Sequence, residues 1–166
     1  MPRYALPFEN ISTSASASTY KTLAALLLAD TAGLRIRLRS LAIAAAATPT
    51  DATLAVQLKR VADVSAGGAG TPNATITTAN IPKADANQAN SPASGGTDYL
   101  TGGVEPSTYE TNALFQMEFN SRGGLIKEWP PSEGPMLNAD QLLGLLVTNR
   151  AAAAVAVSGT LEFETV

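Results

Sequence analysis

The stretch that decides the fold is Val155-Ala156-Val157-Ser158-Gly159-Thr160-Leu161-Glu162-Phe163-Glu164, close to the end of the chain. Val155, Val157, Leu161 and Phe163 share one parity, while small and polar residues hold the other. A period of two is typical of a β-strand with one buried face. The segment therefore predicts a strand whose aliphatic and aromatic side chains enter a core.

A second alternating stretch, Leu34-Arg35-Ile36-Arg37-Leu38-Arg39, puts three aliphatic side chains on one face and three arginines on the other. A helix would scatter those arginines around its circumference. The parity then slips, because Leu41 and Ile43 are odd, and we expect a β-bulge near Arg39-Ser40. Alternation resumes at 54–58 after a turn at 48–51, so residues 34–61 predict an antiparallel pair of strands.

Three further segments have strand character. Residues 113–119 alternate, and the continuous apolar run 142–147 is typical of a strand covered on both faces. Residues 20–32 are ambiguous, because their Leu and Ala content favours a helix. We prefer a strand there, since the neighbouring strands need partners and packing decides strand formation more than the isolated residue does.

The amino-acid composition changes between residues 63 and 110, where seven Gly and four Pro occur among small polar residues. A loop of this length inside a compact domain usually signals function or disorder. The short alternating strands and turn-rich joins predict an all-β protein, an antiparallel β-sandwich. We expect one sandwich domain over 19–166, with the Gly- and Pro-rich insertion at about 63–110.

Composition narrows the chemistry that is open to this chain. It has no Cys and no His among 166 residues, which excludes disulfides, thiolate or imidazole metal sites and His-dependent catalytic triads. We therefore expect that the protein is not an enzyme and that it binds no metal and no cofactor. The chain holds 30 Ala, 18 Thr and 12 Ser, and such small side chains bury little area. We expect self-association, because contacts between copies would add to the small area that such a core buries.

Charge is unevenly distributed along the chain. Residues 1–60 carry seven basic and three acidic groups, and residues 61–166 carry four basic and eleven acidic groups, for a net charge of −3. An acidic total argues against binding to nucleic acid, while the opposite halves can attract each other within or between copies. The longest apolar runs, 23–29 and 41–47, are far shorter than the roughly 20 residues of a membrane span. We expect no membrane partner.

The arginines are the most informative charged feature, and two interpretations stay open. The row Arg35, Arg37 and Arg39 is either a contact surface for an acidic partner or a second subunit, or it pairs across strands within the chain. The candidate internal partners are Glu118, Glu162 and Glu164. Glu162 and Glu164 also form a carboxylate pair on one strand face, which suits acid–base chemistry, calcium binding or an ordinary solvated surface.

Loop aromatics suggest a second kind of site. Trp129 precedes Pro130-Pro131, and with Tyr99 and Tyr109 it offers rings that can stack on sugars. The simpler interpretation is a loop that one large ring pins to the sandwich. Both remain open from the sequence.

The two ends of the chain resemble a known family. The opening 2–10, together with 134–137, Leu142 and the strand 155–164, is similar to the capsid decoration, or cement, proteins of tailed phages. That resemblance implies a jelly roll, a homo-oligomer in the form of a trimer, and an extended N-terminal arm over 1–18. It also implies that Arg3, Tyr4 and Phe8 of the arm contact the major capsid protein or a neighbouring subunit.

The resemblance implies a virion structural protein, made in the host cytoplasm, that stabilises a capsid by binding the outer surface of its shell. A carbohydrate- or receptor-binding module of a phage tail or fibre is the alternative, and it would use the loop aromatics. A carboxylate enzyme such as a glycosidase is a third possibility.

Overall fold

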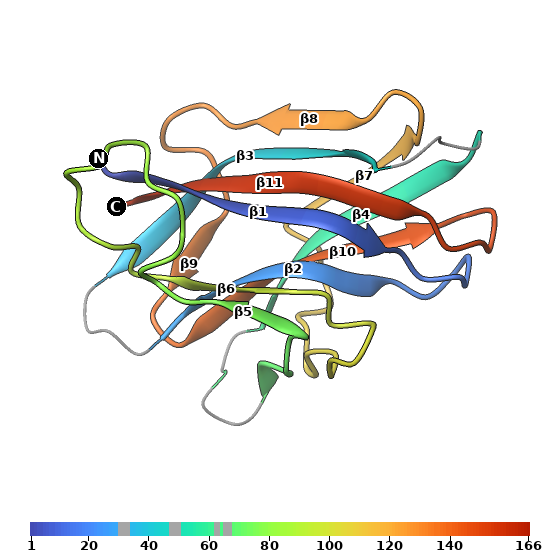
Figure 1. The fold of residues 1–166 in the computed structure, drawn as a ribbon, viewed down its shortest axis with the longest axis horizontal. Coiled ribbons are helices and arrows are strands. Elements are labelled where there is room, and N and C mark those ends of the chain that lie inside the picture. The colour runs from blue at the N-terminus through green and yellow to red at the C-terminus, as the bar shows by residue number, and fades with distance from the viewer. Residues whose placement is uncertain (30–33, 47–50, 62–63, 65–67) are drawn as a thin grey trace.

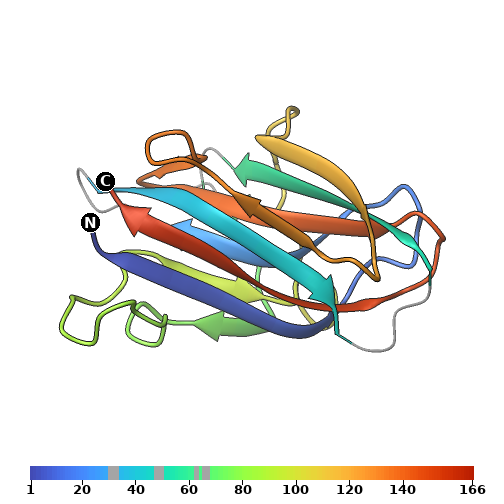
Figure 2. The same ribbon diagram turned by 90° about the horizontal axis from the view of Figure 1, so that it is seen from above.

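A computed structural model describes residues 1–29, 34–46, 51–61, 64 and 68–166. The described part is built from strands in two antiparallel sheets that pack face to face (Figures 1 and 2). The prediction of an all-β sandwich is therefore confirmed. Both chain ends lie at the same end of the sandwich (Figure 1).

Each sheet has a defined strand order. In sheet A the neighbours are, in turn, β1 (Arg3–Ser12), β11 (Ala156–Thr165), β3 (Arg35–Ala45) and β8 (Leu125–Glu128), and β9 (Met136–Asn138) also pairs with β3. In sheet B they are β5 (Ala74–Ile76), β6 (Ser94–Thr97), β2 (Lys21–Leu28), β10 (Gln141–Asn149), β4 (Thr53–Val61) and β7 (Phe115–Asn120). Figure 1 shows β1, β11, β3 and β8 side by side.

This order is that of a jelly roll. Without β5, β6 and β9, the two sheets read β1-β11-β3-β8 and β2-β10-β4-β7, four strands each and all antiparallel. Two interlocking Greek keys give this arrangement. The insertion after β4 adds β5 and β6 beside β2, so part of the expected long loop extends sheet B instead.

The core confirms the patterns of the two most informative strands. Val157, Leu161 and Phe163 of β11 are fully buried between the sheets. Strand β10 lies in the middle of sheet B and is buried along almost its whole length, as its continuous apolar run predicts. The ambiguous segment 20–32 contains strand β2 over Lys21–Leu28, and residues 30–33 lie outside the described part.

The predicted bulge is present in β3. Glu162 of β11 pairs with Ser40, while the next residue, Phe163, pairs with Leu38. Arg39 is therefore the extra residue of β3, and it shifts the parity of the strand as the sequence pattern indicated.

One predicted pairing is wrong. Residues 34–61 do not form an antiparallel pair, because β3 belongs to sheet A and β4 to sheet B. Alternation identifies strands but carries no information on their partners, and here the connection crosses from one sheet to the other. Residues 48–50 of the predicted turn lie outside the described part of the chain.

The extended N-terminal arm is also corrected. Residues 3–12 form β1, which pairs with β11 along its length, from Arg3 opposite Glu164 to Ser12 opposite Ala156. Tyr4 and Phe8 are 3% and 4% exposed, because their parity points them into the sandwich, and Tyr4 stacks on Phe163. These two side chains fill the core of their own subunit. Of the three residues predicted to make contacts from the arm, only Arg3 faces outward.

The insertion covers the outer face of sheet B over β2 and the adjoining part of β10. Tyr99 packs with Ala25, Val61 and Leu142, and Tyr109 packs against the same cluster. The hydroxyl groups of Tyr109 and Thr22 form a hydrogen bond of 2.9 Å. The ring of Tyr109 occupies the space that a side chain at Gly144 of β10 would need. The insertion, for which the sequence predicts a long loop with a function or disorder, thus covers the outer face of β10 at Leu142 and Gly144.

Because Tyr99 and Tyr109 are buried, we expect the free energy of unfolding to fall at alkaline pH. Burial, together with the Glu105 carboxylate, raises the pKa of Tyr99 to about 12, and burial raises the pKa of Tyr109. The unfolded chain releases both protons near pH 10, whereas the folded chain keeps them. The free energy of unfolding should therefore be undiminished below about pH 10 and fall by at least about 2 kcal/mol by pH 12.

Urea denaturation at a series of pH values measures this fall. The double variant Tyr99→Phe, Tyr109→Phe should be less stable at neutral pH and lose less of its stability between pH 10 and 12. Parallel curves for the variant and the unchanged protein would contradict the assignment.

Candidate functional site

The candidate functional site is the outer face of sheet A, which lacks the cover that the insertion gives to sheet B. The side chains there come from β1, β11, β3 and β8, with one parity of each strand pointing away from the core. Along the strands this face changes character, from small side chains at one end to arginines at the other. The two ends are treated in turn.

At the small-residue end lies a broad, shallow hollow of about 530 Å³. Its floor is made by short side chains and glycine across three neighbouring strands, and its rim includes Ile126, which is 76% exposed. The lining side chains that point outward include Pro7, Ala42, Ala44, Ser158 and Thr160. A flat surface of small side chains lets another protein approach the backbone closely. We name it the small-residue hollow.

At the other end, Arg37 and Arg39 flank a buried carboxylate. Glu164 lies 3.9 Å from Arg37 Nη1 and 3.6 Å from Arg39 Nη1, and all three side chains are at least 85% covered. The pairing follows from register, because Glu164 stands opposite Arg37 and the bulge at Arg39 turns that side chain toward the same carboxylate. Of the internal partners predicted for the arginine row, Glu164 is therefore the one observed.

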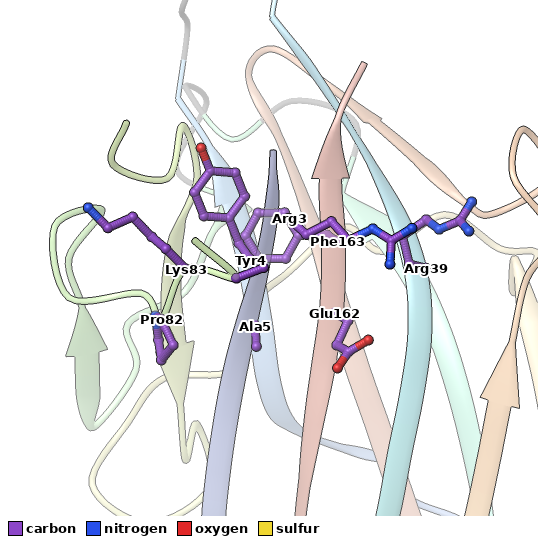
Figure 3. Close-up of a pocket in the computed structure, with 9 residues that line it drawn as sticks. Arg3, Tyr4, Ala5, Arg39, Pro82, Lys83, Glu162 and Phe163 are labelled. Atoms are coloured by element: carbon purple, nitrogen blue, oxygen red, sulfur yellow. The ribbon is translucent and has the colours of Figure 1, made fainter. Parts of the chain in front are cut away.

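Arg3 joins this cluster from β1. A hollow of about 380 Å³ is lined by Met1, Arg3, Arg37, Arg39, Pro131, Ser132 and Glu164, and we name it the basic hollow. Next to it lies a pocket of about 250 Å³, in which Arg3 and Arg39 recur together with Lys83 and Glu162 (Figure 3). Arg35 is exposed at the start of β3 and does not line either hollow.

The other carboxylate of the predicted pair has a different role. Glu162 is exposed and accepts a hydrogen bond of 2.9 Å from the Ser40 hydroxyl. Glu118, the third predicted partner, binds Arg150 at 2.7 Å instead. The two carboxylates on β11 thus differ in environment, one held among arginines and one at the surface.

The three loop aromatics do not form one platform. Tyr99 and Tyr109 are enclosed on the outer face of sheet B, whereas Trp129 follows β8 of sheet A. Trp129 is partly buried against Phe115, with ring centroids 5.6 Å apart, and Lys127 lies 5.6 Å above its ring. The geometry matches the simpler interpretation, in which a large ring pins the loop to the sandwich.

The sandwich has one open side and one closed side. Segment 82–84 runs along the free edge of β1, where Ala5 N donates to Pro82 O at 3.1 Å and Ala84 N donates to Arg3 O at 3.0 Å. On the opposite side β7 and β8 are the last strands of their sheets, and Leu114, Met117 and Ile126 are exposed there. Unprotected edges of this kind favour pairing with another chain.

Two residues near the basic end had no signal in the sequence. Lys83 comes from the insertion and Ser132 from the loop between β8 and β9, so both reach the arginines only through the fold. Ser132 has a φ of 84°, a left-handed conformation that non-glycine residues adopt rarely. Nothing in the local pattern of either loop indicates this placement.

In the described residues, no group of three or more acidic side chains is placed to hold a metal ion. Within the same part of the chain, no helix is long and apolar enough to span a membrane.

Comparison with known proteins identifies no relative. No family model matches the chain, and searches of curated proteins and of solved structures find no match either. Function is therefore inferred from the jelly roll and from the chemistry of the sheet A face.

Proposed function

We propose that this chain is a virion structural protein that decorates a phage capsid, binding the outer surface of the shell as an oligomer and stabilising it. The observation that carries the proposal is the contrast between the two outer faces of the jelly roll. The insertion covers β2 and part of β10 in sheet B, while sheet A presents the small-residue hollow and the basic hollow uncovered. In this proposal, sheet A meets the major capsid protein.

The open side of the sandwich supports the oligomeric part of the proposal. Edge strands β7 and β8 carry exposed apolar side chains, and a second copy would cover them. A trimer places such edges against neighbours, and repeated weak contacts on a symmetric shell add through multivalency. No catalytic step is required of such a protein.

The role of the sheet A face is tested by a substitution in the small-residue hollow. Ala44 is exposed on β3 and lines that hollow, so Ala44→Arg leaves the core intact but blocks close approach of a partner. We expect at least about tenfold weaker co-sedimentation with capsids that lack the protein, since overpacking an interface costs on the order of 1–3 kcal/mol.

The matched control is Ala151→Arg in the exposed turn between β10 and β11. It adds the same charge and volume away from sheet A and should co-sediment like the unchanged protein. Equal binding by both variants would place the contact elsewhere. Light scattering of the unchanged protein tests the oligomer separately, with a trimer expected and a monomer contradicting that part of the proposal.

A further inference from the structure

The basic hollow contains more positive than negative charge. Arg3, Arg37 and Arg39 line it, and Glu164 is its carboxylate. The two distances from Glu164 to the arginines, 3.9 and 3.6 Å, are ion-pair distances but exceed the usual length of a hydrogen bond. One carboxylate at this range leaves the three guanidinium groups incompletely neutralised.

Two of the donors in this cluster have no acceptor. Arg37 Nε and Arg39 Nη1 are buried, and neither has a hydrogen-bond partner within the part of the chain that the structure describes. A covered guanidinium donor without an acceptor is costly, and such a group calls for a functional or structural explanation. Both arginines line the hollow, so an oxygen anion placed there would add the negative charge that Glu164 alone does not supply.

The hollow has room for an anionic side chain together with part of the segment that carries it. Its volume of about 380 Å³ is limited by Pro131 and Ser132 on the loop after β8. Arginine guanidinium groups bind the two oxygens of a carboxylate in a planar, paired geometry. The strained φ of Ser132, 84°, lies in the wall of the same hollow, and backbone strain of this kind clusters at binding sites.

The surroundings argue against an extended polyanion. A third pocket, distinct from the one that contains Lys83, also includes Arg3 and Arg39. It is lined by the carboxylates Glu128 and Glu162. A nucleic-acid backbone crossing the arginines would bring its phosphates against these two carboxylates. A short segment that reaches the arginines with one carboxylate would not.

We propose that the basic hollow binds a carboxylate side chain from an acidic segment of the protein that this chain coats. The inference rests on the proposed function, because it names the chemistry by which sheet A selects its partner. Arg3 is the most accessible contributor, and Arg37 and Arg39 are held in place by Glu164.

A peptide titration tests the site. The probe is a blocked peptide with a few aspartates between glycines, and binding to the full-length chain is followed by calorimetry at low ionic strength. We expect saturable binding that Arg3→Gln weakens about tenfold or more, as for the loss of a hydrogen bond between charged groups. Arg3 forms no ion pair with any other described residue, so within that part of the chain this variant leaves no buried charge behind.

Two further variants make the result specific. Arg122→Gln removes an exposed arginine in the turn between β7 and β8, outside the hollow, and should bind the peptide like the unchanged protein. Glu164→Gln removes the internal competitor and should bind the peptide more tightly while lowering the melting temperature. A merely structural cluster would not give these opposite effects.

Several outcomes would overturn the inference. No peptide binding, equal weakening by Arg3→Gln and Arg122→Gln, or tighter binding of inorganic phosphate or oligothymidylate would each do so. Capsid co-sedimentation of Arg3→Gln separates this inference from the proposed function. If the unchanged protein and the variant bind shells equally, the carboxylate site is wrong and the decoration function stands; if neither binds shells, the function itself fails.

Discussion

Deletion of residues 1–12 should abolish folding rather than release a protein without an arm. Four apolar side chains of β1, Tyr4, Leu6, Phe8 and Ile11, are at most 6% exposed. Burying such side chains contributes about 1.5–3 kcal/mol each, so the strand contributes about 6–12 kcal/mol, comparable with the 5–15 kcal/mol total of a typical domain. The deletion would also leave β11 as an unprotected edge.

Circular dichroism and thermal melting measure this effect. The expected result is loss of the cooperative transition, or an insoluble product. Deletion of residues 1–2, which precede β1, is the control and should melt within a few degrees of the unchanged protein. A cooperative melt of the longer deletion at nearly the same temperature would show that residues 1–12 are a detachable arm after all.

The second large effect is expected from Gly159→Val in β11. A Cβ at this position would overlap the backbone oxygen of Ala42 on β3 and lie 2.5 Å from Cζ of Phe8 on β1. Backbone cannot move aside as an exposed side chain can, so the neighbouring strands β1, β11 and β3 would have to separate. We expect a loss of about 3 kcal/mol or more, at the upper end of overpacking effects.

Urea denaturation measures the loss, and Gly123→Val is the matched control. A Cβ at Gly123 would meet only Asn120 O at 3.7 Å, an ordinary contact, so its cost should stay within about 1 kcal/mol. Equal stability of the two variants would contradict the close packing of β1 and β3 across Gly159.

The sequence predicted the strands better than it predicted their partners. The parity of Val157, Leu161 and Phe163 was sufficient to identify β11 and its buried face, and the parity slip was sufficient to find the bulge at Arg39. Pairing is different, because register and neighbours depend on contacts between residues far apart in the chain. For this reason β3 and β4 were assigned to each other although they belong to different sheets.

The N-terminal segment illustrates a different source of error. Tyr4, Leu6 and Phe8 alternate with the same period of two as β11, so the information for a strand was present. The resemblance to decoration proteins instead suggested an arm. The local pattern was the better guide, because a free arm would leave two aromatic rings in water.

The candidate site could be predicted in part. Arg37, Arg39 and Glu164 were foreseeable because they lie on outward-facing positions of strands, where cross-strand pairing of opposite charge is common. The contributions of Lys83 and Ser132 were not, since loops bring them to the arginines. The burial of Tyr99 and Tyr109 could not be predicted, because nothing in the local sequence indicates that the insertion folds back onto sheet B.

The most direct test of the proposed decoration function is co-sedimentation of the purified protein with the capsids it is proposed to coat, assembled without it. If sheet A binds the shell, the protein should pellet with the capsids and saturate at a fixed ratio of copies to capsid subunits, as expected for a symmetric lattice of equal sites. Protein that stays in the supernatant at every concentration, or that pellets without saturating, would contradict the proposed function.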